Sequence, residues 1–577
     1  MTTFRVWAPS ADRVDLDLGG HRVAMEAGER GWWTVEVADA EAGADYGFCL
    51  DGSDPLPDPR SSWQPEGVHG PSRLVDHAFA WTDQSWTGLH LPAAVLYELH
   101  VGTFSPEGTF DGAIQLLDHL VDLGVNAVEL LPVAEFSGMR GWGYDGVDLY
   151  APHHAYGGPA GLKRFVDACH NRGLGVVLDV VYNHLGPEGN HLGRFGPYFT
   201  DFYATPWGQA VNYDQAGSDE VRRFAIDNAV MWLRDYHLDG LRLDAVQAII
   251  DTSAVHVLEQ MAAEVEELAA CVGRPLFLIG ESDLHDPRLI DPRGAGGLGL
   301  DAQWSDDLHH CLRTAITDER RGYYVDYHGL VDLAACLERG WPHAGDWSPY
   351  RQRTHGRPFG DRQGWKLLAY SQNHDQIGNR AQGDRLSQVL APDRLAVAAA
   401  LVLTSPFLPM VFQGEEWGAT TPFQYFTSHE DPELGRAVSQ GRRSEFSSFG
   451  WKRDEVPDPQ EPSTFERSKL DWDEVTRAPH AELLEWYTKL IGLRRSCPAL
   501  CDGRLDRVRA TADVEAGTLV VERGPVTVVA NLGSAVAAID LAEGRSAEVS
   551  LASSPGVAVT GARVTLPPDS VVVMGAG

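Results

Sequence analysis

Hydrophobic and polar positions change their pattern twice along the chain. About the first ninety residues contain short β-rich runs such as FRVWAP, RVDLDL and WWTVEV, separated by turn residues. A long middle region alternates apolar, strand-like segments with segments of helical period, and after about residue 500 short alternating runs return, as in PVTVVANLG. We therefore predict an N-terminal β-sandwich over residues 1–92, an α/β domain over 93–498 and a small C-terminal β-sandwich over 499–577.

The middle region repeats one structural unit. About eight near-continuous apolar strands alternate with helices across roughly 400 residues, which favours a parallel sheet covered by helices. Eight such units fit a closed (β/α)8 TIM barrel with insertions better than an open sheet. Among its helices, we expect one over 112–124 with Val121 on the buried face, and another that begins with Ser218 as its N-cap.

Charge and cysteine content restrict the partners and the compartment. A net charge of -35 argues against nucleic acid or an anionic membrane surface as a partner. The seven cysteines are scattered without a CxxC pair and no signal peptide is visible, so we expect free thiols and a cytoplasmic location. We also expect a monomer or weak dimer, although no sequence feature fixes the oligomeric state. The uncharged run 395–412 is long enough to span a membrane, but Pro406 and Pro409 interrupt it. They predict a buried helix, a loop and a buried strand instead.

One predicted strand carries charges where a buried strand is otherwise apolar. In GLRLDAV, residues 240–246, Arg242 and Asp244 point to one face, while Leu241 and Leu243 point to the other. An ionised pair on a covered face is costly unless something there requires it, and a structural salt bridge is the simplest alternative. Carboxylates elsewhere in the chain decide between the two interpretations.

Other predicted strands also end in ionisable side chains. They are Asp179 and His184 after the third strand, Glu281 after the fifth, and His374 and Asp375 after the seventh. In a barrel these groups meet at the carboxyl rim, and such a cluster suits glycoside cleavage by a nucleophilic carboxylate and a protonated carboxylic acid about 5 Å apart. Arg242 would keep Asp244 ionised as a nucleophile, and burial or a neighbouring carboxylate would keep the acid protonated.

Four segments, DVVYNH, GLRLDAV, GES and NHDQ, resemble in order and spacing the four signature regions of the α-amylase superfamily, glycoside hydrolase family 13. The resemblance implies Asp244 as the nucleophile, Glu281 as the general acid/base and Asp375 as the transition-state stabiliser. It also implies side chains that surround the sugar at the cleavage subsite, namely Asp179, His184, Arg242, His374 and the stacking Tyr144 with Asp145 beside it.

Longer stretches narrow the resemblance within the superfamily. The β-rich segment before YELHVGTFS resembles the branching and debranching subgroup, whereas YNHLGPEGNHLGRFGPYF and AQWSDDLHH resemble its trehalose-releasing hydrolases. This resemblance implies a retaining hydrolase that cleaves the α-1,4-glucosidic bond next to the trehalose end of maltooligosyltrehalose, so the expected partner is a sugar of the maltooligosaccharide or trehalose type. Glycogen branching by transfer, isoamylase-type debranching and a non-catalytic glucan-binding scaffold are the alternatives.

Polar residues that flank the signature segments are further candidates for sugar contacts. By position these are Gln247, Asp306, His310, Gln376 and Asn379. Each has an alternative role as a helix cap or a water ligand. Trp142 and Trp304 neighbour predicted strand ends and are candidate stacking residues. We expect no cofactor and no metal, because the histidine pairs 153–154 and 309–310 lack the spacing of a zinc site and GAGGLG at 294–299 follows no strand.

Overall fold

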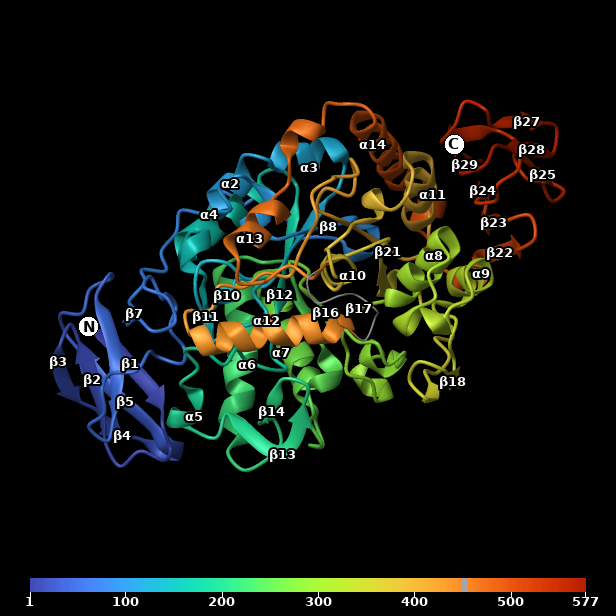
Figure 1. Ribbon diagram of the computed structural model, residues 1–577. Coiled ribbons are helices and arrows are strands. Elements are labelled where there is room, and N and C mark those ends of the chain that lie inside the picture. Colours follow the sequence, from blue (N-terminus) through green and yellow to red (C-terminus); the bar gives the residue numbers. More distant parts are fainter. Residues whose placement is uncertain (448–454, 577) are drawn as a thin grey trace.

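The computed structural model describes residues 1–447 and 455–576, and it places a β-rich module at each end of a central barrel (Figure 1). In the N-terminal module, Phe4 of one antiparallel sheet contacts Tyr46 of the other, with ring centroids 5.1 Å apart. The first sheet contains β1 (Thr2–Trp7), β5 (Trp32–Val37) and β4 (Glu26–Ala27), and the second contains β3 (His21–Ala24), β2 (Val14–Leu18), β6 (Asp45–Leu50) and β7 (Ser72–Arg73). Arg60 ties this module to the barrel by donating to Tyr150 and Asp227, each at 2.9 Å.

The central domain is a closed barrel of eight parallel strands in the spatial order β12–β15–β16–β17–β20–β21–β8–β9. In chain order the strands are β8 (Leu96–Leu99), β9 (Ala127–Leu130), β12 (Gly175–Val180), β15 (Gly240–Leu243), β16 (Phe277–Glu281), β17 (Ala302–Trp304), β20 (Leu367–Ala369) and β21 (Leu408–Phe412). This topology confirms the predicted TIM barrel with flanking β-modules.

Helices cover the outside of most of the barrel (Figure 1). They are α2 (Phe110–Ile114) and α3 (Leu117–Leu123) after β8, α4 (Gly158–His170) after β9, α6 (Ser218–Asp235) after β12, α7 (Val257–Val272) after β15, α8 (Asp306–Thr317) and α9 (Leu330–Arg339) after β17, α11 (Pro392–Leu403) after β20, and α14 (His480–Ser496) after β21. Between β16 and β17 the chain forms only the one-turn helices η5 (Pro287–Leu289) and η6 (Arg293–Ala295), so the alternation of strand and helix is incomplete there.

The barrel interior is apolar at its floor and charged above it. Side chains that fill the floor include Leu96, Ala127, Val177, Phe277 and Met410. Because inward-facing positions repeat every second residue, the next layer begins two residues further along the strands. This layer carries Glu98 on β8, Glu129 on β9, Asp179 on β12 and Arg242 on β15, all buried. The floor therefore closes one end of the barrel, and the charges are directed toward the other.

Two local predictions were wrong. The expected helix over 112–124 is broken between α2 and α3, which changes the phase of its apolar face, and Val121 is 41% exposed. Ser218 is the first helical residue of α6 rather than its cap; Gly217 before it takes the N-cap position with φ 82°. The left-handed conformation of Gly217 redirects the chain into the helix without a side-chain cap.

The uncharged run 395–412 forms a buried helix, a turn and a buried strand, which confirms the prediction. It contributes to α11 and β21 inside the barrel domain. Across the two described ranges, none of the helices combines the length and the apolar character that a bilayer span needs. All seven cysteines are free thiols, as expected.

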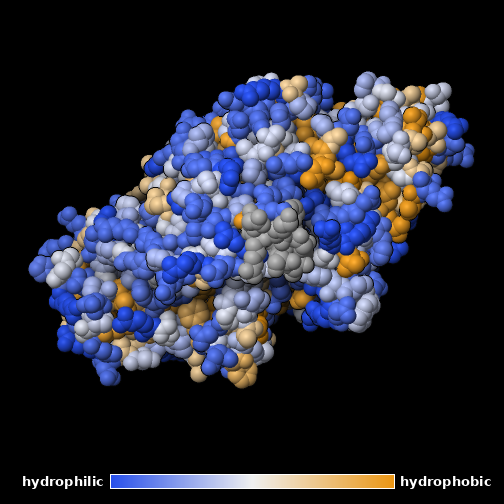
Figure 2. Space-filling model, in the orientation of Figure 1, coloured by the Kyte–Doolittle hydropathy of each residue, from blue (hydrophilic) through white to orange (hydrophobic). Residues whose placement is uncertain are grey.

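The C-terminal module contains two antiparallel sheets that pack beside α11. The first orders β22 (Val508–Asp513), β23 (Thr518–Arg523), β24 (Val526–Asn531), β29 (Ser570–Met574) and β26 (Val549–Ala552), and the second orders β25 (Ala537–Asp540), β28 (Arg563–Leu566) and β27 (Ala558–Thr560). Arg394 of α11 donates to Asp569 at 2.7 Å across this junction. Figure 2 shows a largely hydrophilic surface on this side of the molecule, with apolar residues gathered where the barrel meets the C-terminal module.

Candidate active site

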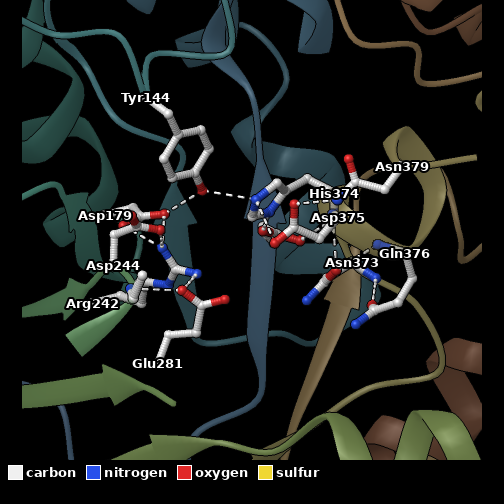
Figure 3. Close-up of polar contacts among 12 residues, drawn as sticks. Tyr144, Asp179, Arg242, Asp244, Glu281, Asn373, His374, Asp375, Gln376 and Asn379 are labelled. Atoms are coloured by element: carbon white, nitrogen blue, oxygen red, sulfur yellow. Dashed lines mark hydrogen bonds and ion pairs between the residues drawn. The ribbon is translucent and has the colours of Figure 1, made fainter. Parts of the chain in front are cut away.

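Four barrel strands deliver ionisable side chains to one place at the carboxyl end of the barrel, in and next to the charged layer (Figure 3). Asp179 lies on β12, Arg242 on β15 with Asp244 directly after it, and Glu281 at the end of β16. After β20 the chain turns into the short helix α10 (His374–Gly378), whose first two residues are His374 and Asp375. The structure therefore brings together the residues that the sequence assigned to catalysis.

Arg242 is the centre of this cluster, and its side chain is fully buried. Its guanidinium lies 2.7 Å from Asp179, 2.8 Å from Asp244 and 2.9 Å from Glu281. Although burial by itself lowers the pKa of Arg242, the surrounding acidic groups, Asp179 first among them, outweigh it and raise the pKa. The carbon at the centre of the guanidinium also lies 4.2 Å from the ring centroid of Trp304, so an aromatic face supports the cation.

Glu281 is set up to hold a proton. Burial, together with the negative charges of Asp244 and Asp375, raises the pKa of Glu281 well above its ordinary value, although Arg242 opposes this. The backbone N–H of Ala245 donates to one Glu281 oxygen at 2.8 Å. Ala245 has φ 38° and ψ 52°, a left-handed conformation that bends the chain sharply directly after this N–H. A carboxylic acid that stays protonated near neutral pH can protonate a leaving oxygen.

Asp244 is held at both carboxylate oxygens. Arg242 donates to Oδ1 at 2.8 Å, and the side-chain amide of Asn183 donates to Oδ2 at 3.1 Å. Beside it, the His184 ring bonds through Nε2 to the carbonyl oxygen of Tyr144 at 3.1 Å, and burial lowers the pKa of His184. The hydrogen bonds from Arg242 and Asn183 fix the orientation of the Asp244 carboxylate.

Tyr144 and His374 form a directed chain of hydrogen bonds between two carboxylates. Tyr144 donates from its hydroxyl to Asp179 at 2.5 Å, and its oxygen lies 2.8 Å from Nε2 of His374. Nδ1 of His374 lies 2.5 Å from Glu98. Burial would lower the pKa of His374, but Asp375 and Glu98 overcome it and raise the value to about 9, so both ring nitrogens donate. Burial likewise raises the pKa of Asp179 to about 7, against the influence of Arg242.

Asp375 occupies the first turn of α10, which a capping box closes. The side-chain oxygen of Asn373 accepts from the backbone N–H groups of Asp375 and Gln376, and Gln376 returns a contact to the backbone of Asn373. The amide of Gln376 also donates to Asp306 at 2.7 Å, and burial raises the pKa of Asp306 to about 6. Both ends of the Gln376 amide thus bond to protein groups and help to cap α10, and its contact with sugar stays a prediction.

The remaining candidates differ in how they face the site. Gln247 is exposed in the one-turn helix η4 (Val246–Ala248) after β15, and Asp145 is partly exposed, 4.0 Å from His429. His310 is buried, and its ring packs against Tyr323 and Tyr327 with centroids 4.6 and 4.8 Å away. Burial lowers the pKa of His310 to about 3, which keeps its ring neutral at ordinary pH.

The two tryptophans proposed as stacking surfaces are not open to solvent. Trp304 is 2% exposed beneath Arg242, and Trp142 is 5% exposed against Phe423 and His374. The prediction of open stacking faces is therefore wrong for both. Trp207, 48% exposed between β13 (Phe199–Thr205) and β14 (Gly208–Val211), instead stacks on the ring of His184 with centroids 4.5 Å apart.

Two buried acids of the site were missed in the sequence. Glu98, which bonds His374, and Glu129, beside it on the neighbouring strand, stand inside VLYELHVG and VNAVELLPV. Burial and the charge of Glu98 raise the pKa of Glu129 well above its ordinary value. A charged residue inside an otherwise apolar strand was the available signal, as it was for Arg242.

Among the described residues, one group of side chains with metal-ligand chemistry gathers outside this site: Glu135, His153 and His154. Nδ1 of His153 accepts from the backbone N–H of Ala155 at 3.1 Å, so its Nε2 carries the proton and faces Glu135 at 3.6 Å. His154 bonds the same carboxylate oxygen at 2.6 Å. A metal ion could bind these two ring nitrogens only if both lost the protons that face Glu135. The three side chains therefore fit a Glu135 carboxylate that accepts hydrogen bonds from two histidines better than they fit a metal site.

A (β/α)8 barrel with an arginine-bridged group of carboxylates at its carboxyl rim defines a glycoside hydrolase of the α-amylase type. A family model described as "Alpha amylase, catalytic domain" matches residues 74–197, and one described as "Domain of unknown function (DUF3459)" matches residues 503–573. The chain is 56% identical over 532 residues to the malto-oligosyltrehalose trehalohydrolase of Arthrobacter ramosus, covering 91% of this chain and 92% of the relative. The chain belongs to the malto-oligosyltrehalose trehalohydrolase family.

Two other comparisons place this assignment within the superfamily. A crystal structure of a candidate alpha amylase from Salmonella typhimurium superimposes with a TM-score of 0.89 at 37% identity, covering 99% of this chain and 97% of the other. The 1,4-alpha-glucan branching enzyme GlgB of Corynebacterium jeikeium is 28% identical over 473 residues, covering 72% of this chain and 61% of that enzyme. The branching enzyme is thus a much more distant relative than the trehalohydrolase.

Proposed function

We propose that the protein is a retaining glycoside hydrolase that cleaves the α-1,4-glucosidic bond next to the trehalose end of malto-oligosyltrehalose and releases trehalose and a malto-oligosaccharide. The bridging of Asp244 and Glu281 by one guanidinium, at 2.8 and 2.9 Å, carries the glycosidase part of this proposal. It holds the two carboxyl groups close together, which suits the separation of about 5 Å in retaining enzymes better than the wider spacing of inverting ones. The choice of the trehalose-ended substrate rests on the relatives.

In the first step Glu281 gives its proton to the glycosidic oxygen. Asp244 forms a bond to the anomeric carbon on the opposite face as the bond to the leaving oxygen breaks, and trehalose departs with the proton of Glu281. We assign to Asp375, in the first turn of α10, the stabilisation of the positive charge that develops on the sugar ring. The raised pKa of Glu281 suits this first role, because the group enters the reaction protonated.

In the second step the ionised Glu281 takes a proton from water. The water oxygen bonds to the anomeric carbon, the bond to Asp244 breaks, and the malto-oligosaccharide leaves with its configuration retained. Glu281 is then protonated again and Asp244 is again a carboxylate. The contacts of Asp244 with Arg242 and Asn183 suit its return as a leaving carboxylate, since both donors stabilise the negative charge.

Other side chains are proposed to bind the sugars around the cleaved bond. Direct contact is assigned to those that the cluster or its rim presents: Tyr144, Asp145, Asp179, His184, Arg242, Gln247 and His374. Asp306, His310, Gln376 and Asn379 are proposed to bind sugar further along the rim, and each also contacts a protein group that holds it in place.

The domain boundaries, the compartment and the assembly state of the protein are also proposals. The division into residues 1–92, 93–498 and 499–577 follows the change from β-rich modules to the barrel. A cytoplasmic location is supported by the seven free cysteines, and a monomer or weak dimer is proposed for the assembly.

Product analysis on malto-oligosyltrehalose, plain malto-oligosaccharides and glycogen tests the proposed function. We expect free trehalose from the first substrate and little change in the other two. Chain transfer on glycogen, or release of branches from it, would replace the proposal with the branching or debranching activity. Retention is tested separately by following the anomeric configuration of the released malto-oligosaccharide, which should start as α.

A further inference from the structure

A helix that follows the last barrel strand reaches the catalytic rim from outside the barrel. It is α12 (Pro432–Ser447), which crosses the front of the barrel domain in Figure 1. Arg442, partly buried on this helix, donates to the side-chain oxygen of Asn379 at 3.1 Å and to the backbone oxygen of Gly378. These two acceptors lie at the end of α10, the helix that begins with His374 and Asp375.

Asn379 connects Arg442 to the catalytic carboxylate. Its side-chain nitrogen donates to Oδ1 of Asp375 at 3.0 Å, and its backbone N–H donates to the carbonyl oxygen of Asp375 at 2.8 Å. The oxygen of the Asn379 amide therefore accepts from a donor, Arg442, and its nitrogen donates to an acceptor, Asp375. The guanidinium of Arg442 can only donate, and the carboxylate of Asp375 in its ionised form can only accept.

This arrangement decides which way the amide of Asn379 points. An asparagine side chain can rotate so that its oxygen and nitrogen exchange places. If Arg442 were absent, the oxygen of Asn379 could face Asp375, and two acceptors would then repel each other. The donor-only guanidinium excludes this orientation, because it requires an oxygen on its own side. Arg442 thereby keeps an N–H group directed at Asp375.

The guanidinium is itself held in place by aromatic packing. Its central carbon lies 4.9 Å from the ring centroid of Tyr425, which meets Trp142 edge-on with centroids 5.2 Å apart. Trp142 in turn meets His374 at 5.5 Å and lies so close to Gly378 that a Cβ there would come within 2.1 Å of the indole. Arg442 is thus fixed relative to both ionisable residues of α10.

We infer that Arg442 is a positioning residue for the hydrolysis, acting through Asn379 to orient the carboxylate of Asp375. This inference rests on the proposed function, since it assigns Asp375 to the stabilisation of the transition state. Arg442 does not touch the reacting atoms in this assignment. Its effect is on turnover rather than on which bond is cleaved.

The test is a double-mutant cycle on the full-length enzyme with malto-oligosyltrehalose as substrate. Arg442→Ala and Asn379→Ala should each lower kcat at least about tenfold, because a misdirected carboxylate stabilises the transition state less. KM should change much less than kcat. The double variant should be no worse than the poorer single variant, since both substitutions remove the same contact. If the fold-losses of kcat in the two single variants multiply in the double variant, the inference is wrong.

Further variants separate positioning from a general loss of structure. Arg442→Lys retains a donor-only group and should recover part of the lost kcat. Asn379→Asp keeps an acceptor for Arg442 but removes the donor to Asp375, so its kcat should fall at least as far as that of Asn379→Ala. The control Arg443→Ala changes the neighbouring residue, whose guanidinium contacts Asp458 at 3.3 Å, and should leave kcat unchanged.

Two results would refute the assignment even if one variant folds poorly. One is a wild-type kcat in Asn379→Asp, and the other is an equal loss of kcat in Arg442→Ala and in the control Arg443→Ala. Trehalose remains the expected product of every active variant. If trehalose is released but the cycle is additive, the inference fails while the proposed function stands. If no form of the enzyme releases trehalose, the proposed function fails first.

Discussion

Glu98→Gln removes one negative charge from beneath the active site while keeping the shape of the side chain. Glu98 is 1% exposed and lies 2.5 Å from Nδ1 of His374, with a second contact to the backbone N–H of His374 at 3.2 Å. Glutamine can still accept one hydrogen bond from the ring. It cannot balance the charge of the imidazolium, so we expect the pKa of His374 to fall in this variant.

The size of the effect follows from the shift in the wild-type protein. Asp375 and Glu98 outweigh burial and raise the pKa of His374 from 6.5 to about 9, and a shift of that size corresponds to about 3 kcal/mol of folding free energy. Because two carboxylates share it, we assign about 1–2 kcal/mol to Glu98. The raised pKa stabilises the folded state fully below pH 6.5, where His374 is protonated in both folded and unfolded chains. The contribution is lost as the pH rises through about 9.

Urea unfolding followed by tryptophan fluorescence measures this directly. Wild type and Glu98→Gln are compared at about pH 6 and at about pH 9.5, on either side of the window in which His374 changes its charge. The loss of unfolding free energy in the variant should be largest at the lower pH and shrink toward zero at the higher one. Glu485→Gln, an exposed site on α14, supplies the control with no such dependence. A loss that stays constant or grows with pH would refute the assignment of an imidazolium beside Glu98.

Three further predictions concern the catalytic rim. Glu281→Gln and Asp244→Ala should each fold normally and lower kcat by about 10²–10⁴-fold, measured as trehalose release; activity near that of wild type in either would remove its assigned role. In the wild type, kcat/KM should fall as the pH rises through the raised pKa of Glu281, since the ionised group cannot protonate the leaving oxygen; an alkaline limb in the ordinary range of carboxylic acids would contradict this. Gly378→Ala places a Cβ 2.1 Å from the indole of Trp142 and should lower the free energy of unfolding by about 1–3 kcal/mol. An unchanged melting temperature in thermal unfolding would show that Trp142 can move aside without cost.

The alternation of polar and apolar positions predicted the barrel and its charged rim well, because both depend on local rules. Arg242 on β15 and Asp244 directly after it point to the same side for the same reason that Leu241 and Leu243 pack against the helices. Glu98 obeys the same rule and was missed, because a single charge in an apolar strand does not reveal its partner. That partner, His374, lies 276 residues further along the chain.

What the pattern could not predict depends on tertiary geometry. The break between α2 and α3 rotates Val121 outward, although the apolar spacing alone suggests a continuous helix. Gln376 looks like a sugar ligand beside a signature motif, yet its amide is used by Asp306 and by the start of its own helix. Trp304 stands at a strand end, but the guanidinium of Arg242 covers the face that a sugar would need.

The left-handed backbone at Ala245 has a consequence for how the enzyme can vary. The peptide N–H that immediately follows Asp244 bonds Glu281, so the spacing of these two carboxyl groups is set partly by main-chain geometry. Among substitutions only proline, which has no backbone N–H, can delete that hydrogen bond, whereas any residue that resists a positive φ will shift it. Glycine should therefore be tolerated at this position and a β-branched residue should not. Substrate preference can diverge through the surrounding loops while this peptide unit and the guanidinium of Arg242 together keep Asp244 and Glu281 close to each other.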